Sequence, residues 1–124
     1  MKVLALDYGS ARTGVAVSDP TGMLARPVAT IERVEETAGF HELLALVRSE
    51  EPELVVVGLP LTLRGEHGEQ ARATTAFVER LRAAVETRVE LWDERFTSVL
   101  AGGDDAKAAA HLLSSYLEWF GARS

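Results

Sequence analysis

Cysteine and long apolar segments are both absent from this sequence of 124 residues. Without cysteine, the chain can form neither disulfides nor thiolate metal sites. No apolar run approaches the roughly 20 residues needed to cross a bilayer. Asp7 interrupts the apolar residues behind Met1 before they could form the core of a signal peptide. These absences favour a cytoplasmic protein with no membrane partner.

Lysine is scarce as well, with two Lys against eleven Arg, and no cluster of basic residues occurs along the chain. The formal net charge of −6 argues mildly against a nucleic-acid partner, because phosphate contacts need Lys and Arg. It does not exclude a metal-dependent nuclease, whose carboxylates are neutralised by bound cations. The surplus of Arg suits bidentate phosphate contacts, although a GC-rich genome would also produce it. Composition leaves the partner open.

Hydrophobic residues make up 47% of the chain, enough for the core of one domain of ordinary size. Apolar runs predict five strands, at residues 2–7, 14–18, 24–31, 54–58 and 88–92. Helical spacing predicts three helices: one N-capped by Thr37, one from about His67 to Val85, and one from near Asp104 whose inward stripe ends at Phe120.

The predicted order is three strands, then helix, strand, helix, strand, helix. The first three strands would form a meander, with Pro27 placing the third at an edge. Helices between the later strands imply crossovers and parallel pairing. The sequence therefore predicts one α/β domain over residues 1–124, with a five-stranded mixed sheet flanked by helices.

Acidic residues fall where such a sheet gathers its ligands, at the carboxyl ends of parallel strands. Asp7 ends the first strand, Asp93 and Glu94 end the fifth, and Asp104 and Asp105 open the last helix. Phosphodiester hydrolysis by two hard cations about 4 Å apart needs such oxygen ligands, which suit Mg²⁺ or Mn²⁺. The pattern favours a metal-dependent nuclease.

Each acid also has a purely structural interpretation. Asp7 could cap the turn at Gly9, the Asp93–Arg95 segment could form a surface ion pair, and Asp104 and Asp105 could serve as helix caps. Arg12 could contact a phosphate or simply be solvated. The D-x-G pattern at Asp7 also occurs in actin-like ATPases and sugar kinases, so it does not decide the function alone.

Five blocks of the chain, in order, resemble the YqgF/RuvX family. They are LALDYGSARTGVAVSD, ARPVATI, VVVGLPLTLRGEHGEQA, VELWDERFTS and DAKAAAHLLSSYL. The family is described as Holliday junction resolvases and pre-16S ribosomal RNA nucleases. The resemblance implies a ribonuclease H-like fold and products with a 5′-phosphate and a 3′-hydroxyl.

The resemblance also implies site residues. Asp7 matches the family's first-strand acid, Glu94 the glutamate of its D-E-R block and Asp105 the aspartate of its D-x-x-A-A block. These three are the candidate catalytic residues and metal ligands, with Asp104 and Asp93 as second choices.

Two features depart from the family. Only residues 99–103 separate Ser98 from Asp104, where relatives carry a longer insert rich in Lys and Arg. Established junction resolvases have a glutamate at the end of the fourth strand, where this chain has Gly58-Leu59-Pro60. If the first and fifth strands flank the fourth, their backbones lie roughly 9–10 Å apart. Acids on them should then meet only through intervening metal ions.

The leading hypothesis is a nuclease that acts by a two-metal mechanism on structured nucleic acid. Its substrate would be the 5′ end of pre-16S rRNA, a Holliday junction or single-stranded DNA. With no basic cluster, Arg12, Arg64 and Arg95 are the candidate substrate contacts, and a two-fold junction would favour a homodimer. The alternatives are a non-catalytic nucleic-acid or ribosome-binding module of the same fold and an actin-like phosphotransferase, for which 124 residues provide only one of two domains.

Overall fold

The computed structural model describes residues 1–62, 64–94 and 105–123, and its elements follow the predicted order. In chain order they are β1 (Val3–Asp7), β2 (Arg12–Ser18), β3 (Ala25–Glu32), α1 (Thr37–Glu50), β4 (Leu54–Leu59), α2 (Glu69–Ala84), β5 (Arg88–Asp93) and α3 (Asp105–Arg123). The predicted strands and helices are present in the described chain, with small shifts at their ends.

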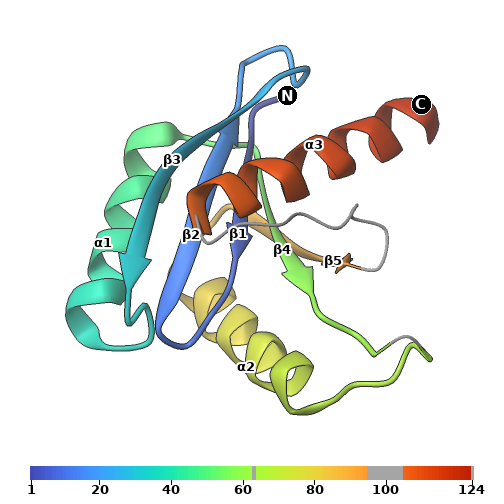
Figure 1. Ribbon diagram of the computed structural model, residues 1–124. Coiled ribbons are helices and arrows are strands. Elements are labelled where there is room, and N and C mark those ends of the chain that lie inside the picture. Colours follow the sequence, from blue (N-terminus) through green and yellow to red (C-terminus); the bar gives the residue numbers. More distant parts are fainter. Residues whose placement is uncertain (63, 95–104, 124) are drawn as a thin grey trace.

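The five strands form one sheet in the order β3-β2-β1-β4-β5. β1, β2 and β3 pair antiparallel, as the predicted meander requires, and β4 pairs parallel with both β1 and β5. Pro27 lies in edge strand β3, where a missing N–H group is tolerated. β1, β4 and β5 therefore end at one edge of the sheet, which also receives the start of α3 (Figure 1).

Helices cover both faces of the sheet, with α1 and α2 on one side and α3 on the other (Figure 1). Alternation along β1 sends Leu4 and Leu6 into the layer with α1 and α2, and Val3 and Ala5 into the layer with α3. Burying a side chain as large as Leu contributes roughly 1.5–3 kcal/mol, so each layer stabilises the sheet. Within the described residues, no helix is both long and apolar enough to span a membrane.

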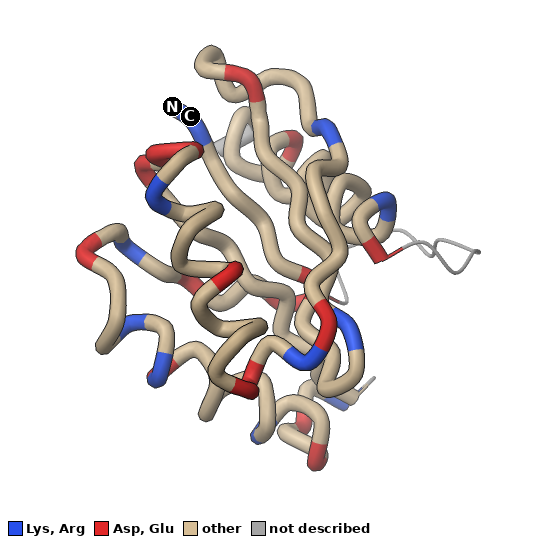
Figure 2. The backbone as a smooth tube through the Cα atoms, turned by 90° about the vertical axis from the view of Figure 1, so that its left-hand side faces the viewer, with Lys and Arg blue, Asp and Glu red and all other residues tan. Residues whose placement is uncertain are grey.

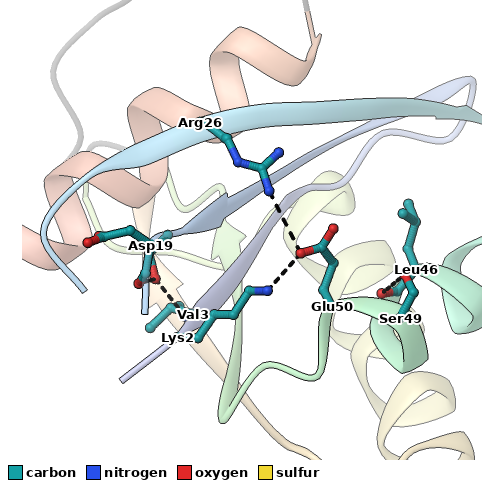
Figure 3. Close-up of polar contacts among 8 residues, drawn as sticks. Lys2, Val3, Asp19, Arg26, Leu46, Ser49 and Glu50 are labelled. Atoms are coloured by element: carbon teal, nitrogen blue, oxygen red, sulfur yellow. Dashed lines mark hydrogen bonds and ion pairs between the residues drawn. The ribbon is translucent and has the colours of Figure 1, made fainter. Parts of the chain in front are cut away.

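An ion-pair cluster ties the opposite end of the sheet together (Figure 3). Glu50, the last residue of α1, lies between Lys2 Nζ at 2.8 Å and Arg26 Nη2 at 3.9 Å. Beside it, the backbone N–H of Val3 donates to the Ser18 hydroxyl at 2.8 Å. Surface ion pairs contribute at most about 1 kcal/mol each, so this cluster fixes the start of β1 modestly.

Two predicted details are wrong. Thr37 is the first residue of α1 rather than its N-cap; the cap position is Glu36, which makes no side-chain capping bond. Phe120 was expected to face inward, but it is 42% exposed because α3 extends past the strands that cover its earlier apolar residues. The residues that precede it on the predicted inward stripe, Ala109, Leu112, Leu113 and Tyr116, are buried.

Candidate active site

Asp7 ends β1 on the face of the sheet that α3 covers. Its Cα partner on β2 is Gly14. On the other side, β1 pairs with β4 up to Leu6 and Val57, so the next residue, Gly58, lies beside Asp7. The half-buried carboxyl group of Asp7 therefore stands between two glycines.

Glu94 follows the last residue of β5, and its carboxyl group reaches that of Asp7. Its side chain lies over Gly58, so that a Cβ atom on Gly58 would be 2.4 Å from Glu94 Oε1. The strand order β1-β4-β5 is as expected. The expectation that acids on β1 and β5 could meet only through metal ions is wrong, because β4 has no side chain at this point.

The Asp7–Glu94 pair has perturbed proton affinities. Burial raises the pKa of Glu94 to about 7, and the charge of Asp7, its hydrogen bond and the charge of Asp93 add to this effect. Burial also raises the pKa of Asp7, whereas the hydrogen bond with Glu94 lowers it and the charge of Asp105 raises it. The hydrogen bond acts in opposite directions on the two groups because Glu94 donates and Asp7 accepts.

Asp105 is the first residue of α3, and its carboxylate is held by Arg12 of β2. Arg12 Nε donates to Asp105 Oδ2 at 2.9 Å. The negative charge of Asp105 is close enough to Asp7 to raise its pKa. The structure thus brings three predicted residues, Asp7, Glu94 and Asp105, to one edge of the sheet and places Arg12 with them.

The other predicted site residues are less central. Asp93 is the last residue of β5, and alternation turns it away from the face that carries Trp92, although its charge acts on Glu94. Arg64 is exposed in the loop that follows β4. Arg95 and Asp104 lie outside the described residues.

The donor atoms at this edge suit a hard divalent cation. Asp7 and Glu94 offer carboxylate oxygens, the ligand type that Mg²⁺ and Mn²⁺ prefer, and two carboxyl groups in contact favour positive charge beside them. Among the residues that the structure describes, no group of three His, Cys, Asp or Glu side chains is arranged to hold a metal ion. The fit therefore rests on the Asp7–Glu94 pair, with Asp105 engaged by Arg12.

Tyr8 is a buried residue of this region that sequence reasoning did not single out. Its hydroxyl donates to the Glu35 carboxylate, and its ring stacks on Phe77 of α2 with centroids 4.7 Å apart. Burial, followed by the hydrogen bond to Glu35, raises the pKa of Tyr8 above its ordinary value. The sequence did carry a signal for Tyr8, since it is an aromatic residue directly after the candidate metal ligand Asp7. Tyr8 anchors the end of β1 from the face opposite to Asp7.

Comparisons with known proteins give matches over most of the chain. The sequence model of the RuvX family, described as "Holliday junction resolvase", matches residues 1–119. Two relatives are each named "Putative pre-16S rRNA nuclease". The one from Roseiflexus sp. strain RS-1 is 44% identical over 100 residues, covering 81% of this chain and 71% of its own. The one from Rubrobacter xylanophilus is 45% identical over 131 residues, covering 94% and 92%.

A solved structure, "T. thermophilus RuvC in complex with Holliday junction substrate", superposes with a TM-score of 0.62 at 15% identity, covering 98% of this chain and 96% of that one. The fold is thus ribonuclease H-like, with acids at the carboxyl edge of a mixed sheet. The chain belongs to the RuvX family. The Rubrobacter alignment is longer than the 124 residues of this chain, so that relative has residues that this chain lacks.

Proposed function

We propose that this protein is a divalent-metal-dependent nuclease in which Asp7 and Glu94 are the central metal ligands and Asp105 is the third acid. The observation that carries the proposal is the contact between the Asp7 and Glu94 carboxyl groups, in a chain whose relatives are named nucleases. Two acids forced together in this way need either a shared proton or a cation.

A bound Mg²⁺ or Mn²⁺ would supply positive charge for the phosphodiester transition state and make water more acidic; a second ion would complete a two-metal mechanism. Asp7 and Glu94 would hold the cation through their carboxylate oxygens, with the proton of Glu94 released to solvent. Arg12 is 60% exposed at its side chain, so it can exchange Asp105 for a substrate phosphate. That exchange would free the Asp105 carboxylate to act beside Asp7.

The substrate we propose is structured nucleic acid: the 5′ end of pre-16S rRNA, a four-way junction or single-stranded DNA. Along the backbone, positions with Lys or Arg are interspersed with positions that carry Asp or Glu (Figure 2). Binding should therefore involve few phosphate contacts, with Arg12 and Arg64 as described candidates. We propose that residues 1–124 act as one nuclease domain in this role.

The decisive experiment is a cleavage panel with purified protein and Mg²⁺ or Mn²⁺ on structured RNA, single-stranded DNA and four-way junctions. Asp7→Asn should preserve the fold and abolish turnover, because an amide can hydrogen-bond but cannot supply the negative charge that holds a cation. Glu42→Gln, on the exposed face of α1, makes the same chemical change away from the site and should leave turnover intact.

Cleavage that Asp7→Asn does not diminish would remove Asp7 from the mechanism. Cation-dependent binding of these substrates without Asp7-dependent turnover would instead support a non-catalytic module of the same fold.

A further inference from the structure

A row of three residues crosses the middle of the sheet at its carboxyl edge: Gly14 on β2, Asp7 on β1 and Gly58 on β4. Neighbouring residues on adjacent strands project to the same face. On the face covered by α3, this row therefore presents the carboxyl group of Asp7 with an empty position on each side.

Other parts of the site fill both empty positions. A Cβ atom on Gly14 would lie 1.7 Å from the main-chain oxygen of Asp105 and 2.3 Å from its carbonyl carbon. A Cβ atom on Gly58 would lie 2.4 Å from Glu94 Oε1 and 2.7 Å from Glu94 Cγ. The backbone at Asp105 and the side chain of Glu94 thus occupy the volumes that side chains at positions 14 and 58 would need.

Backbone conformation does not account for these two glycines. Among the described residues, the glycines with positive φ are Gly22 and Gly65, so Gly14 and Gly58 have backbones that any residue could adopt. Glycine in the interior of a strand is destabilising, because it loses more conformational freedom on folding and packs no side chain. The backbone of Asp105 leaves no room for a Cβ atom at position 14, and a Cβ atom at position 58 would displace the Glu94 side chain from its place over β4.

We propose that Gly14 and Gly58 are positioning residues for the two acids that flank Asp7. Gly58 lets a carboxylate that belongs to β5 cross β4 and reach Asp7, and Gly14 lets the first turn of α3 settle on β2 so that Asp105 faces the same group. The catalytic part of this inference rests on the proposed nuclease function. Its geometric part, that Gly58 acts through Glu94, does not.

Stability measurements in chelator test the geometric part. At pH 4.5, where the Glu94 carboxyl group is protonated and hydrogen-bonded to Asp7, Gly58→Ala should lower the melting temperature of the full chain, because the new methyl group displaces the Glu94 side chain. In a Glu94→Ala background the obstructing side chain is gone, and Ala loses less conformational freedom than Gly when a strand forms. Gly58→Ala should then leave the melting temperature unchanged or raise it. Gly121→Ala, in helix α3 and with no atom within 4 Å of its added Cβ, is the control; it should raise the melting temperature slightly and by the same amount in both backgrounds.

This reversal of sign distinguishes positioning from a general packing defect. An equal loss of stability in both backgrounds would show that Gly58 does not act through Glu94, and would overturn the inference. Gly14→Ala meets backbone atoms that no side-chain deletion can remove, so it should destabilise in every background and is not used as the main test.

Cation binding and cleavage test the catalytic part. Gly58→Ala should weaken Mn²⁺ binding and turnover by roughly 10–100-fold, the range found when a group supporting a metal ligand is lost. The double variant Gly58→Asp with Glu94→Ala places a carboxylate in the volume vacated by Glu94. It should recover part of the Mn²⁺ affinity that Glu94→Ala loses.

Gly58→Ala with wild-type Mn²⁺ affinity and turnover would overturn the catalytic part. If the wild-type protein neither binds Mn²⁺ nor cleaves nucleic acid, the proposed function fails, while the stability reversal still decides whether Gly58 positions Glu94.

Discussion

The Glu94 carboxyl group should make the metal-free protein lose stability as the pH rises. Its pKa is about 7 in the folded protein and 4.5 when unperturbed. Below pH 4.5 both folded and unfolded states are protonated there, and the folded state has no penalty. Between the two values the unfolded chain releases its proton while the folded protein keeps it, so the free energy of unfolding falls and reaches its lower level above pH 7.

The magnitude follows from the same difference in pKa. At 1.36 kcal/mol per pH unit it amounts to roughly 3 kcal/mol, which partial exposure of the group to water reduces to roughly 2 kcal/mol. In a domain of this size, that corresponds to a melting temperature change of roughly 6–8 °C. Glu94→Gln cannot ionise, so in chelator it should be more stable than the wild type at pH 8 and close to it at pH 4.5.

Differential scanning fluorimetry of both proteins from pH 4.5 to 8, with chelator or Mn²⁺, measures this. Titration of groups that do not interact with Glu94 cancels in the difference between the two proteins. Mn²⁺ should stabilise the wild type more at pH 8 than at pH 5 and should have little effect on Glu94→Gln. The reasoning would be refuted if the difference in melting temperature between the two proteins did not change with pH. It would also be refuted if the variant were less stable than the wild type at pH 8 in chelator.

Three further changes probe other charged groups, two at the site and one at the opposite end of the sheet. Arg12→Ala should lower the slope of log K against log salt by roughly one contact in anisotropy titrations with Ca²⁺ in place of Mg²⁺, and an unchanged slope would exclude a phosphate contact. Asp105→Asn keeps the shape of the side chain but loses its charge, so turnover should fall at least tenfold with little change in melting temperature. Near-normal turnover would remove Asp105 from the catalytic site. Hydrogen bonds to the Asp19 carboxylate, first among them that from the Leu24 backbone, lower its pKa from 3.8 to about 2. The ionised Asp19 carboxylate therefore stabilises the folded protein fully above pH 3.8, and this stabilisation is lost as the pH falls through 2. The urea midpoints of the wild type and Asp19→Asn should converge on acidification. A difference between the two midpoints that stays constant with pH would contradict this prediction.

The sheet could be predicted because its strands are short, apolar and separated by clear helical periodicity. The run Leu54–Val57 is apolar at every position, which is typical of a strand buried on both faces, and the structure places it in the parallel part of the sheet. Pro27 likewise indicated an edge strand. Such signals are local and depend little on the rest of the chain.

The contacts of the site could not be predicted in the same way. Asp105 and Arg12 pair across 93 positions of sequence. The meeting of Glu94 with Asp7 depends on a missing side chain on a third strand. Strand order alone suggested a gap of two strand spacings, because a backbone distance does not include the reach of a glutamate passing over a glycine. The prediction for Thr37 failed because α1 begins at Thr37 itself, one residue earlier than predicted. The residue of a good capping type therefore does not occupy the cap position.

The alternation at the end of β1 means that the acids of the site are not equally anchored. Asp7 projects toward α3, but the next residue, Tyr8, is locked into the opposite layer by Phe77 and Glu35. The position of Asp7 is thus secured by the half of the protein that takes no part in the site. Asp105, in contrast, keeps its place only while α3 stays docked on β2. If α3 were to lift from the sheet, the site would lose one acid and keep its central pair.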